Sequence, residues 1–540
     1  MVRFVEGQGC RWFARVVAAL VAGVVVGCGT PAAAPVQVTV LAINDFHGHL
    51  QPPRGGLRRP DPAEPGKSLN LPAGGAAHLA TAVREAKATL PNPVFVAAGD
   101  LIGASPLISA LFQDEPTVMA LGAMGLFASA VGNHEFDRGA AELLRLQGLA
   151  RFQYLAASTR VRATGQPLLP PYVVRSFEGV PVAFIGLTLQ ATPSIVVPSG
   201  VAGLDFLDEA ETVNALVPTL QAQGVEAIVL LIHEGGFPAR GAGDCPGLSG
   251  PIVGIVERLH PAVDVVVSGH THRSYLCRVA GKLVTSAEQY GTVLTQIQLH
   301  IDRGTRDVVA AQAQNVVVDP QRFAADPQVA ALVQAAAQRA QPLAQRVVGR
   351  LAAPLPREPD AAGESPAGRA IADAQLAATS DAGAQIALMN PGGVRAALAP
   401  GPDGAVRYED LFNVQPFYNN LVTMTLSGAE LAALLEQQWQ GQPFARVLQV
   451  SSGFGYRWDA AAPPGRRVLP GSLRLNGRPI APDEPVRITV NRFLADGGDN
   501  FSVLKTERDR RTGVMDIDAL EAFVVRGLPP DGAPRIERLN

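Results

Sequence analysis

Five short apolar stretches in the first half of the chain each end in a side chain that carries a nitrogen or oxygen ligand atom. Continuous, β-branched apolar stretches of this length are typical of strands that are buried on both faces of a sheet. We expect their last residues to emerge together at one edge, which would then carry two Asp, one Asn and several His. The stretches are residues 38–47, 94–100, 130–139, 227–233 and 263–272.

The side chains at these ends form a set with the composition of a metal site. Alternate residues of an extended chain point the same way, so Asp45 with His47, and His270 with His272, can each face a common site. Seven nitrogen and oxygen ligands exceed the need of one tetrahedral ion and suit two ions that share a carboxylate. Such a pair, about 3.5–4 Å apart, clamps a phosphate ester and turns water into hydroxide at neutral pH. The candidate ligands are Asp45, His47, Asp100, Asn133, His233, His270 and His272.

Each ending alone has a simpler interpretation. A single His after an apolar stretch is more often a buried core residue, and a single Asp there more often caps a helix. Five such endings within one half of the chain, using five of its nine His, argue against coincidence.

Length and composition indicate a multidomain globular protein. The 540 residues exceed what one hydrophobic core supports and suggest two to four domains. The formal net charge is −3 and the hydrophobic content is 47%, so the chain has no excess of positive charge that would attract a nucleic-acid polymer. The sequence does not indicate an oligomeric state.

The first 28 residues have the pattern of a signal peptide. Arg3, Arg11 and Arg15 precede an apolar segment, 16–27, that is too short to span a bilayer. The segment 25–28, Val-Val-Gly-Cys, resembles a bacterial lipobox. The resemblance implies cleavage before Cys28, a lipid on its sulfur, and an exported protein anchored in the cell envelope. The alternative is an ordinary signal peptide with a chance cysteine.

The cysteine count agrees with export. Cys10 would leave with the signal peptide and Cys28 would carry the lipid, so Cys245 and Cys277 remain. Two thiols in an oxidising compartment are expected to pair. A bridge between them would hold down the loop after His233; the alternative is two unrelated free thiols.

Periodicity divides the remaining chain into two domains and a linker. We expect a β-rich domain at 36–320, a linker helix at 326–348 with an N-cap Asp and Pro at its first position, and a second domain at 350–540 that has no His. Two segments, 51–75 and 460–467, show no regular periodicity and are predicted loops. Predicted helices are 76–90, 107–124 (broken at Pro116) and 208–223; predicted strands are 172–177 with 180–187 as a hairpin, 225–232, 283–286 and 293–301.

The motifs together resemble a known family. Asp45-Phe-His47, Gly99-Asp100, Gly132-Asn-His-Glu-Phe-Asp137, His233 and Gly269-His-Thr-His272 resemble the calcineurin-like metallophosphoesterase signature. Their order and spacing resemble more narrowly the bacterial 5′-nucleotidase and UDP-sugar hydrolase family, to which the vertebrate ecto-5′-nucleotidase also belongs. The resemblance implies an α/β protein: an N-terminal metallophosphoesterase β-sandwich flanked by helices (αββα), and a C-terminal α/β nucleotidase domain that binds the substrate.

The resemblance also implies roles for individual residues. One divalent ion would be held by Asp45, His47, Asp100 and His272, and a second by Asp100, Asn133, His233 and His270. His134 matches a histidine that contacts the phosphate in the transition state, and Asp137 matches the carboxylate that orients it. The ligand set suits Zn, Mn, Fe, Co or Mg and does not choose among them.

Three segments of the C-terminal half resemble the substrate-binding segments of the family: 390–395, 415–419 and 491–499. In the family two aromatic rings sandwich the base, and an Asp accepts hydrogen bonds from the ribose. Each Phe taken alone is equally typical of a core aromatic residue. The expected substrate-binding residues are Asn390, Arg395, Phe417, Asn419, Phe493 and Asp499.

The chain departs from the family pattern at two places. Near Glu364, the ecto-enzyme has an arginine where this chain has Gly363 and an asparagine where it has Arg369. Pro391 replaces the first glycine of the loop at 390–395. These departures leave the fine specificity open, including whether Arg369 supplies the missing charge.

The sequence therefore predicts an exported hydrolase with a dinuclear metal centre. It would remove phosphate from nucleoside 5′-monophosphates by in-line attack of metal-bound hydroxide. Hydrolysis of UDP-sugars, of NAD or of 2′,3′-cyclic nucleotides remains an alternative, as does a surface lipoprotein that binds nucleotides without catalysis.

Overall fold

A computed structural model describes residues 34–61, 64, 67–239, 245, 247–528 and 533–540. The predicted signal peptide, with Cys10 and Cys28, lies outside the described residues. No helix within the described ranges is long and apolar enough to cross a membrane.

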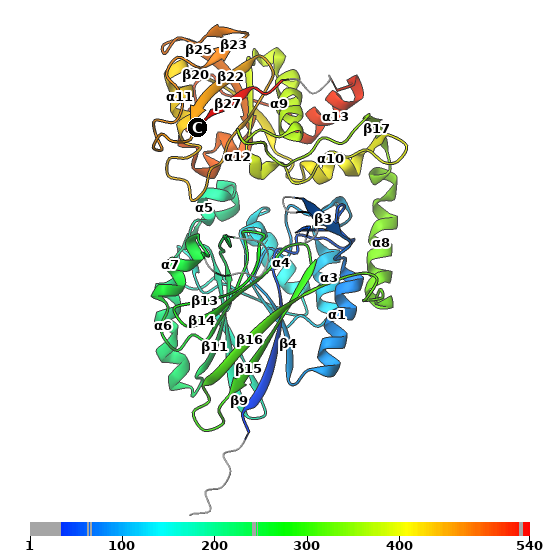
Figure 1. Ribbon diagram of the computed structural model, residues 1–540, viewed down its shortest axis with the longest axis vertical. Coiled ribbons are helices and arrows are strands. Elements are labelled where there is room, and N and C mark those ends of the chain that lie inside the picture. Colours follow the sequence, from blue (N-terminus) through cyan, green and yellow to red (C-terminus); the bar gives the residue numbers. More distant parts are fainter. Residues whose placement is uncertain (1–33, 62–63, 65–66, 240–244, 246, 529–532) are drawn as a thin grey trace, which may run out of the picture.

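Two six-stranded sheets pack face to face in the N-terminal domain (Figure 1). The first has the order β16-β15-β1-β4-β5-β6 and the second β13-β14-β12-β11-β9-β8. The first sheet consists of β1 (Val36–Ile43), β4 (Pro93–Ala97), β5 (Ala128–Ala130), β6 (Gln153–Leu155), β15 (Val293–Ile301) and β16 (Val308–Val317). The second consists of β8 (Tyr172–Phe177), β9 (Val180–Thr188), β11 (Ala227–His233), β12 (Val265–Ser268), β13 (Ser274–Val279) and β14 (Lys282–Ala287).

The continuous apolar stretches reflect burial of both faces of these strands. In β11, Val229 and Leu231 belong to the core between the two sheets, whereas Leu230 and Ile232 belong to the core under the outer helices. Every residue of β11 is buried. A polar side chain could therefore appear only at the strand ends, which is where the candidate ligands stand.

Helices cover both outer faces of the sandwich (Figure 1). The apolar faces of α1, α3 and α4 share a core with the first sheet, and those of α6 and α7 share one with the second. This is the predicted αββα arrangement. The helices are α1 (Ala76–Thr89), α2 (Leu107–Ala110), α3 (Glu115–Ala123), α4 (Ala140–Leu149), α5 (Thr192–Ile195), α6 (Glu209–Ala222) and α7 (Pro251–Arg258); β7 (Thr159–Val161) and β10 (Leu204–Phe206) form a separate pair.

The C-terminal domain is a second α/β unit, drawn above the sandwich in Figure 1. Its five-stranded sheet has the order β21-β18-β25-β20-β26, and a four-stranded sheet has the order β24-β23-β22-β27. The strands are β18 (Ile386–Met389), β20 (Asn420–Ser427), β21 (Gln449–Val450), β22 (Phe454–Asp459), β23 (Arg474–Leu475), β24 (Arg478–Pro479), β25 (Pro485–Asn491), β26 (Arg511–Met515) and β27 (Ile536–Leu539). The helices are α9 (Pro366–Ala378), α10 (Tyr408–Val414), α11 (Gly428–Glu436), α12 (Arg492–Ala495) and α13 (Asp516–Arg526).

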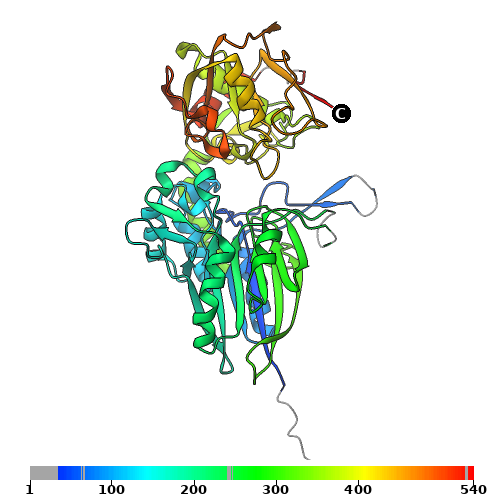
Figure 2. The ribbon, with the colours of Figure 1, turned by 90° about the vertical axis from the view of Figure 1, so that its left-hand side faces the viewer.

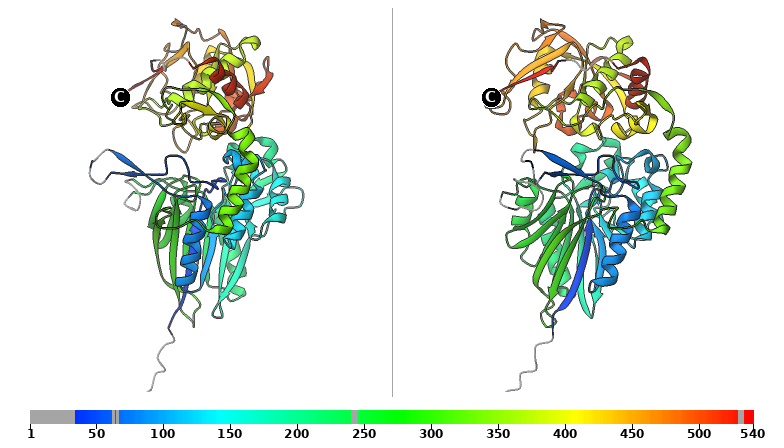
Figure 3. Two further views of the ribbon diagram at one scale, coloured as in Figure 1. Left: turned by 90° about the vertical axis from the view of Figure 1, so that its right-hand side faces the viewer. Right: turned by 45° about the vertical axis from the view of Figure 1, so that its right-hand side comes forward.

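One helix, α8 (Pro327–Ala344), runs along the side of the sandwich and reaches the C-terminal domain (Figure 3). The Oδ1 atom of its N-cap Asp326 accepts hydrogen bonds from the backbone N–H groups of Gln328 and Val329, both at 3.1 Å. The predicted end at residue 348 is wrong. The chain leaves the helix earlier because β17 (Val347–Arg350) pairs with β19 (Ala405–Arg407).

The segment 51–75 is not the loop that the sequence predicted. It contains a hairpin of β2 (Leu57–Pro60) and β3 (Ser68–Leu71), which projects from the sandwich in Figure 2. Of these strand residues only Leu57 is buried. An exposed hairpin needs no apolar alternation, so the sequence carried no signal for it. The segment 460–467 contains no helix or strand, as predicted.

The break in the predicted helix 107–124 also lies elsewhere. It falls between α2 and α3, where Gln113 and Asp114 have positive φ values of 54° and 61°. Pro116 stands in the first turn of α3, where its missing N–H costs no hydrogen bond. Asp114 accepts a hydrogen bond of 2.7 Å from the Ser109 hydroxyl, which holds this turn closed.

Cys245 and Cys277 form a disulfide, as the sequence predicted. Cys277 lies in β13 and Cys245 lies in the segment that follows His233. The bridge therefore ties that segment to the edge of the second sheet.

Asp264, just before β12, allows a test of the fold that leaves the site alone. Burial raises the pKa of its carboxyl from an ordinary value of 3.8 to about 7, and its oxygen accepts a 2.8 Å hydrogen bond from the Ile228 N–H. The folded protein binds this proton more tightly than the unfolded chain does. The carboxyl therefore costs stability increasingly as the pH rises from about 4 to about 7.

We expect Asp264→Asn to melt at the same temperature as the unchanged protein near pH 4 and roughly 2–4 °C higher at pH 8. Thermal unfolding followed by circular dichroism at both pH values measures this difference. Asp381→Asn, at an exposed position, is the control and should show no pH-dependent gain. An equal gain for Asp264→Asn at both pH values would contradict the expectation.

Candidate metal centre and active site

The seven candidate ligands lie at one end of the sandwich, where strands of both sheets finish. β1, β4 and β5 run parallel in the first sheet, and β11 and β12 run parallel in the second. Parallel strands present their carboxyl ends at one edge, so the residues that follow them converge. Asp45 and His47 follow β1, Asp100 follows β4, Asn133 follows β5, His233 ends β11, and His270 and His272 follow β12.

The backbone brings these ligands together in a way that the sequence did not predict. Asp45, His47, Asp100, His270 and His272 all have positive φ values, between 46° and 68°. The i, i+2 pairs do lie in the candidate metal clusters, as predicted, but the reason given for this is wrong because the chain is not extended at these residues. Left-handed non-glycine residues cost about 1–3 kcal/mol each and persist where surrounding structure compels them, commonly at functional sites.

The first group of ligands consists of Asp45, His47 and His272. His272 Nε2 lies 3.2 Å from Asp45 Oδ1 and 3.1 Å from His47 Nε2. His47 Nε2 lies 3.6 Å from Asp100 Oδ2. These four side chains are the ligands that the family resemblance implied for one ion.

The second group consists of Asp100, His233 and His270. His233 Nε2 lies 3.0 Å from Asp100 Oδ2, the oxygen that also faces His47. Asn133 is buried and its Oδ1 has no hydrogen-bond partner; the backbone N–H of the next residue, His134, donates to Asp100 Oδ1 at 2.9 Å. Asp100 thus stands between the two groups, as a bridging carboxylate must.

The ring tautomers fit a metal. Nδ1 of His47 lies 2.9 Å from the Gly103 carbonyl, and Nδ1 of His233 lies 2.8 Å from the Ala98 carbonyl. A carbonyl only accepts, so each Nδ1 carries a proton and each Nε2 is the ring nitrogen that faces the site and can bind a metal. Nε2 of His233 faces the Asp100 carboxylate at 3.0 Å. Imidazole nitrogens and carboxylate oxygens that converge on one buried volume are ligands that a divalent cation binds.

The electrostatics also favour a cation. Burial lowers the pKa of His233, but Asp100 and Asp45 outweigh burial and raise it to about 10. Burial and the neighbouring His233 lower the pKa of His270 to about 3, and burial holds the pKa of His47 well below its ordinary value. The carboxylates therefore stabilise positive charge at the centre, while two of the rings stay neutral and able to bind metal.

Glu135 is a residue of the site that the sequence reasoning missed. It is buried, and its carboxylate accepts hydrogen bonds from the backbone N–H groups of Asp100 (3.0 Å), Leu101 (2.8 Å) and Gly132 (2.6 Å). Burial and Asp100 raise its pKa to about 8. Glu135 joins the two loops that carry Asp100 and Asn133. The sequence shows an acidic residue within the stretch 130–139, and this was the signal from which Glu135 could have been identified.

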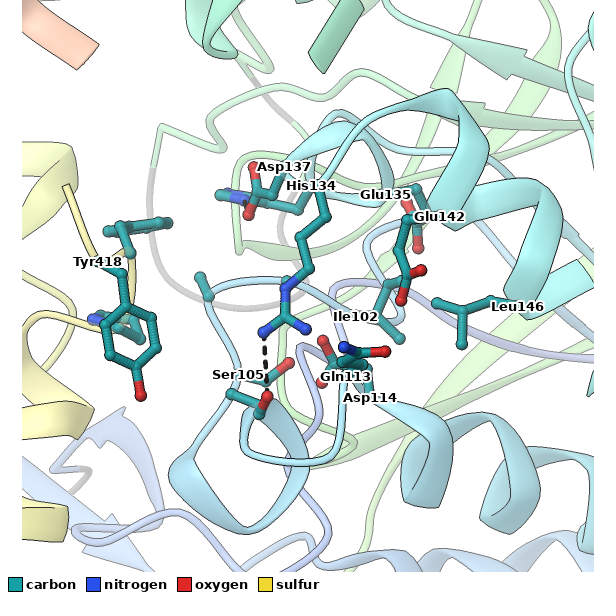
Figure 4. A pocket seen from close by; sticks show the side chains of 16 residues that line it. Ile102, Ser105, Gln113, Asp114, His134, Glu135, Asp137, Glu142, Leu146 and Tyr418 are labelled. Carbon is teal, nitrogen blue, oxygen red and sulfur yellow. Dashed lines mark hydrogen bonds and ion pairs between the residues drawn. The ribbon is translucent and has the colours of Figure 1, made fainter. Parts of the chain in front are cut away.

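His134 and Asp137 form a pair beside the metal ligands. His134 Nδ1 lies 2.8 Å from Asp137 Oδ2, and the His134 ring lies 5.0 Å from the His47 ring, centroid to centroid. Burial lowers the pKa of His134, but Asp137 and Asp100 outweigh it and raise the pKa. A cavity of about 80 Å³ adjoins the pair; Figure 4 shows Asp114 on its far side and Tyr418 at the edge that the C-terminal domain supplies.

Two predicted substrate residues of the C-terminal domain reach this centre. The Phe417 ring stacks on His134 with centroids 5.9 Å apart and planes inclined by 20°. The guanidinium of Arg395 lies 5.9 Å from the Phe417 ring, and its charge lowers the pKa values of His47 and His272. Nε and Nη2 of Arg395 are buried without a hydrogen-bond partner.

Three other predicted residues gather around α12 and the turn η5 (Gly498–Asn500). Asn390 Nδ2 donates to Asp499 Oδ2 at 2.9 Å, and the Asn491 amide donates to Asn390 at 3.0 Å. Phe493 packs on Gly498, where an added Cβ would lie 2.5 Å from the ring. Among the described residues no ring contact joins Phe493 to Phe417, so the sandwich of a base between them stays a prediction.

Asn419 lies apart from these residues. Its side chain hydrogen-bonds the buried carboxyl of Asp516, and its backbone carbonyl accepts from the Asp516 N–H at 2.8 Å. In this arrangement it holds the start of α13.

The departures from the family pattern have structural explanations. Gly363 has a φ of 97°, and an added Cβ would lie 2.7 Å from the Val447 side chain, so no arginine fits there. Arg369 is buried, and its charge acts on Glu364. Pro391 begins the exposed turn η4 (Pro391–Gly393), where a missing N–H costs no hydrogen bond.

Fold and site together define a metal-dependent phosphoester hydrolase of the calcineurin-like class. The family profile "Calcineurin-like phosphoesterase" matches residues 38–274, and "5'-nucleotidase, C-terminal domain" matches residues 347–506. The chain belongs to the 5′-nucleotidase family, in which these two domains follow one another, as the sequence predicted.

Individual relatives agree with the family. The chain is 29% identical to a 5′-nucleotidase precursor from Thermus thermophilus, whose crystal structure matches with a TM-score of 0.79 over 93% of this chain and 99% of that one. It is 26% identical to a 5′-nucleotidase of Diplobatis ommata over 91% of this chain and 88% of that protein. It is 32% identical to Endonuclease YhcR of Bacillus subtilis over 91% of this chain, but spans only 40% of that protein's length.

Removing the carboxylate of Asp100, which lies between the two groups of ligands, should weaken the binding of metal. We expect Asp100→Asn, which keeps the size of the side chain, to weaken divalent-metal binding by more than about 100-fold. Elemental analysis of the purified, desalted protein measures the metal per chain. Asp264→Asn is the matched control because it lies at the opposite end of β12. Equal metal content in both variants would refute the role of Asp100.

Proposed function

We propose that the protein is a 5′-nucleotidase with a dinuclear metal centre, which releases phosphate from nucleoside 5′-monophosphates. The observation that carries this proposal is the meeting of the two domains. Phe417 of the C-terminal domain stacks on His134 of the centre, and the guanidinium of Arg395 lies over the Phe417 ring and acts electrostatically on His134. A phosphate at the metals would therefore also reach a guanidinium, and the nucleoside would extend toward the C-terminal domain.

The residues present fit two divalent ions. Asp45, His47, Asp100 and His272 would hold one ion, and Asp100, Asn133, His233 and His270 the other. Bound metals supply Lewis acidity toward the phosphate and lower the pKa of water to near neutrality. The set of imidazole, carboxylate and amide ligands is compatible with Zn, Mn, Fe, Co or Mg.

The side chains around the metals would bind and stabilise the phosphoryl group. The unpartnered N–H groups of Arg395 suit the oxygens of a phosphate, which accept from a guanidinium in a bidentate manner. His134 would donate from Nε2 to an oxygen on which charge develops, because Asp137 occupies its Nδ1. Attack of water on phosphorus, in line with the ribose oxygen, would form a new P–O bond and break the ester P–O bond. The water would thus supply an oxygen to phosphate and a proton to the released nucleoside.

Asn390, Phe493 and Asp499 would bind the nucleoside. Stacking on a ring contributes about 1–3 kcal/mol per base and accepts every base, so we expect a broad nucleotide range. Asn419 was expected in this set, but its contact with Asp516 supports a structural role.

We also propose that the protein is exported and anchored by a lipid on Cys28. The pattern of residues 3–28 supports this, and the disulfide Cys245–Cys277 agrees with an oxidising compartment. In a bacterial host supplied with radiolabelled palmitate, the unchanged protein should incorporate the label and Cys28→Ala should not. Equal labelling of the two proteins would contradict lipid anchoring by this residue.

A substrate panel tests the activity. We expect metal-dependent release of phosphate from 5′-mononucleotides, lost with a chelator and restored by divalent metal. UDP-sugars, NAD and 2′,3′-cyclic nucleotides test the alternatives, since each yields a distinct product. Binding of nucleotides without turnover under any metal would overturn the proposal.

His134→Asn tests the chemistry apart from metal binding. Because His134 would stabilise developing charge, we expect kcat for a 5′-mononucleotide to fall roughly 100- to 1000-fold. Metal content should equal that of the unchanged protein, in contrast to Asp100→Asn. Full turnover in the His134→Asn variant would exclude this role.

A further inference from the structure

Arg446 is a buried cation next to the predicted ribose acceptor. It lies in the segment 437–446, which follows α11. The side chains of Arg446 and Asp499 are only 12% and 5% exposed, and Nη1 of Arg446 donates to Asp499 Oδ1. The resemblance to the family did not single out Arg446.

The segment 437–446 fixes Asp499 from two directions. Gln442 Nε2 donates to the Asp499 backbone carbonyl at 2.6 Å, while Arg446 holds the carboxylate. Asn390 holds the other carboxylate oxygen at 2.9 Å, and the residue has a positive φ of 55°. Each carboxylate oxygen has two acceptor sites, so Asp499 can still accept from a ligand in the orientation set by Arg446.

The segment 437–446 also contains buried polar atoms that have no hydrogen-bond partner. Nε of Arg446 and Oε1 of Gln442 are buried and have no hydrogen-bond partner. A buried guanidinium N–H without a partner costs free energy unless a ligand satisfies it. Both atoms belong to residues that contact Asp499, so a ligand there would find a donor and an acceptor besides the carboxylate.

A series of ring contacts extends from Arg446 to the metal-ligand loops. The Arg446 guanidinium lies 4.8 Å from the Phe444 ring, and the Phe444 ring meets Phe237 of the N-terminal domain edge to face at 5.7 Å. The Arg273 guanidinium lies 5.9 Å from the Phe237 ring. Arg273 follows His272, and Phe237 lies in the segment after His233.

We propose that Arg446 is a positioning residue that determines specificity for ribose at the nucleotide site. Its guanidinium orients the Asp499 carboxylate toward the vicinal hydroxyls of the ribose. The contact between Phe444 and Phe237 supports this orientation when the two domains meet. The inference rests on the proposed nucleotidase function and names the group that selects the sugar.

The test compares AMP, 2′-deoxy-AMP and p-nitrophenyl phosphate, which has no ribose. In Arg446→Ala we expect KM for AMP to rise about tenfold or more, because a charged hydrogen-bond partner of a buried carboxylate is lost. The preference for AMP over 2′-deoxy-AMP should fall toward one. KM for p-nitrophenyl phosphate should rise several-fold less than KM for AMP.

Two further variants refine the result. Arg446→Lys keeps the charge but not the planar fork, so we expect an intermediate KM for AMP. Arg538→Ala is the matched control, because Arg538 also lies over a ring, that of Trp458 at 5.5 Å, on an exposed surface of the same domain. It should have the kinetics of the unchanged protein.

Unchanged KM and sugar preference in Arg446→Ala would overturn the inference, and so would an equal rise in KM for all three substrates.

If Arg446→Ala does not fold, the Phe444→Ala variant tests the inference instead, because Phe444 is 44% exposed and the ion pair between Arg446 and Asp499 remains. In Phe444→Ala we expect KM for AMP to rise about threefold and the preference for AMP over 2′-deoxy-AMP to weaken. If neither quantity changes, the inference is overturned. An unchanged protein that cleaves p-nitrophenyl phosphate but no nucleotide would refute the nucleotidase function itself.

Discussion

The site depends on a buried Asp100 carboxylate that lies among imidazole rings. Its Oδ2 lies 3.0 Å from His233 Nε2 and 3.6 Å from His47 Nε2, and all three side chains are buried. A buried carboxylate needs positive charge beside it, which divalent cations would supply. The same cations would activate a phosphate ester. The burial that makes the charge of Asp100 costly is therefore also what favours metal binding.

Such a centre requires a rigid scaffold, and the sandwich provides it at the carboxyl ends of its parallel strands. Five ligands have left-handed backbone conformations, which the chain would not adopt alone. Glu135 joins the loops after β4 and β5 through three backbone N–H groups. The disulfide Cys245–Cys277 ties down the segment after His233. The geometry of the ligands is thus held by groups that need not touch a metal.

The C-terminal domain completes the site. Phe417 stacks on His134, and Phe444 meets Phe237 at a second place on the domain interface. Both N-terminal partners lie in loops that carry metal ligands, so the position of the second domain is coupled to the centre. The N-terminal domain alone would, in the proposed function, hold the metals but would lack Asn390 and Asp499, which are proposed to bind the nucleoside. In the proposed function, the interface lets one protein recognise the phosphate and the nucleoside together.

The sequence by itself placed the candidate ligands at the ends of continuous apolar strands, because such strands leave polar residues only there. The sandwich followed from the resemblance of the motifs to a known family, and the disulfide followed from the two cysteines that remain in an exported chain. It could not reveal the hairpin in 51–75, whose exposed strands carry no apolar alternation, or the early end of α8, which depends on pairing with Ala405–Arg407. Only the tertiary structure showed that Asn419 faces Asp516, that Glu135 joins two ligand loops and that Arg446 lies on Asp499. Those facts depend on contacts between residues far apart in the chain, and local pattern carries no record of such contacts.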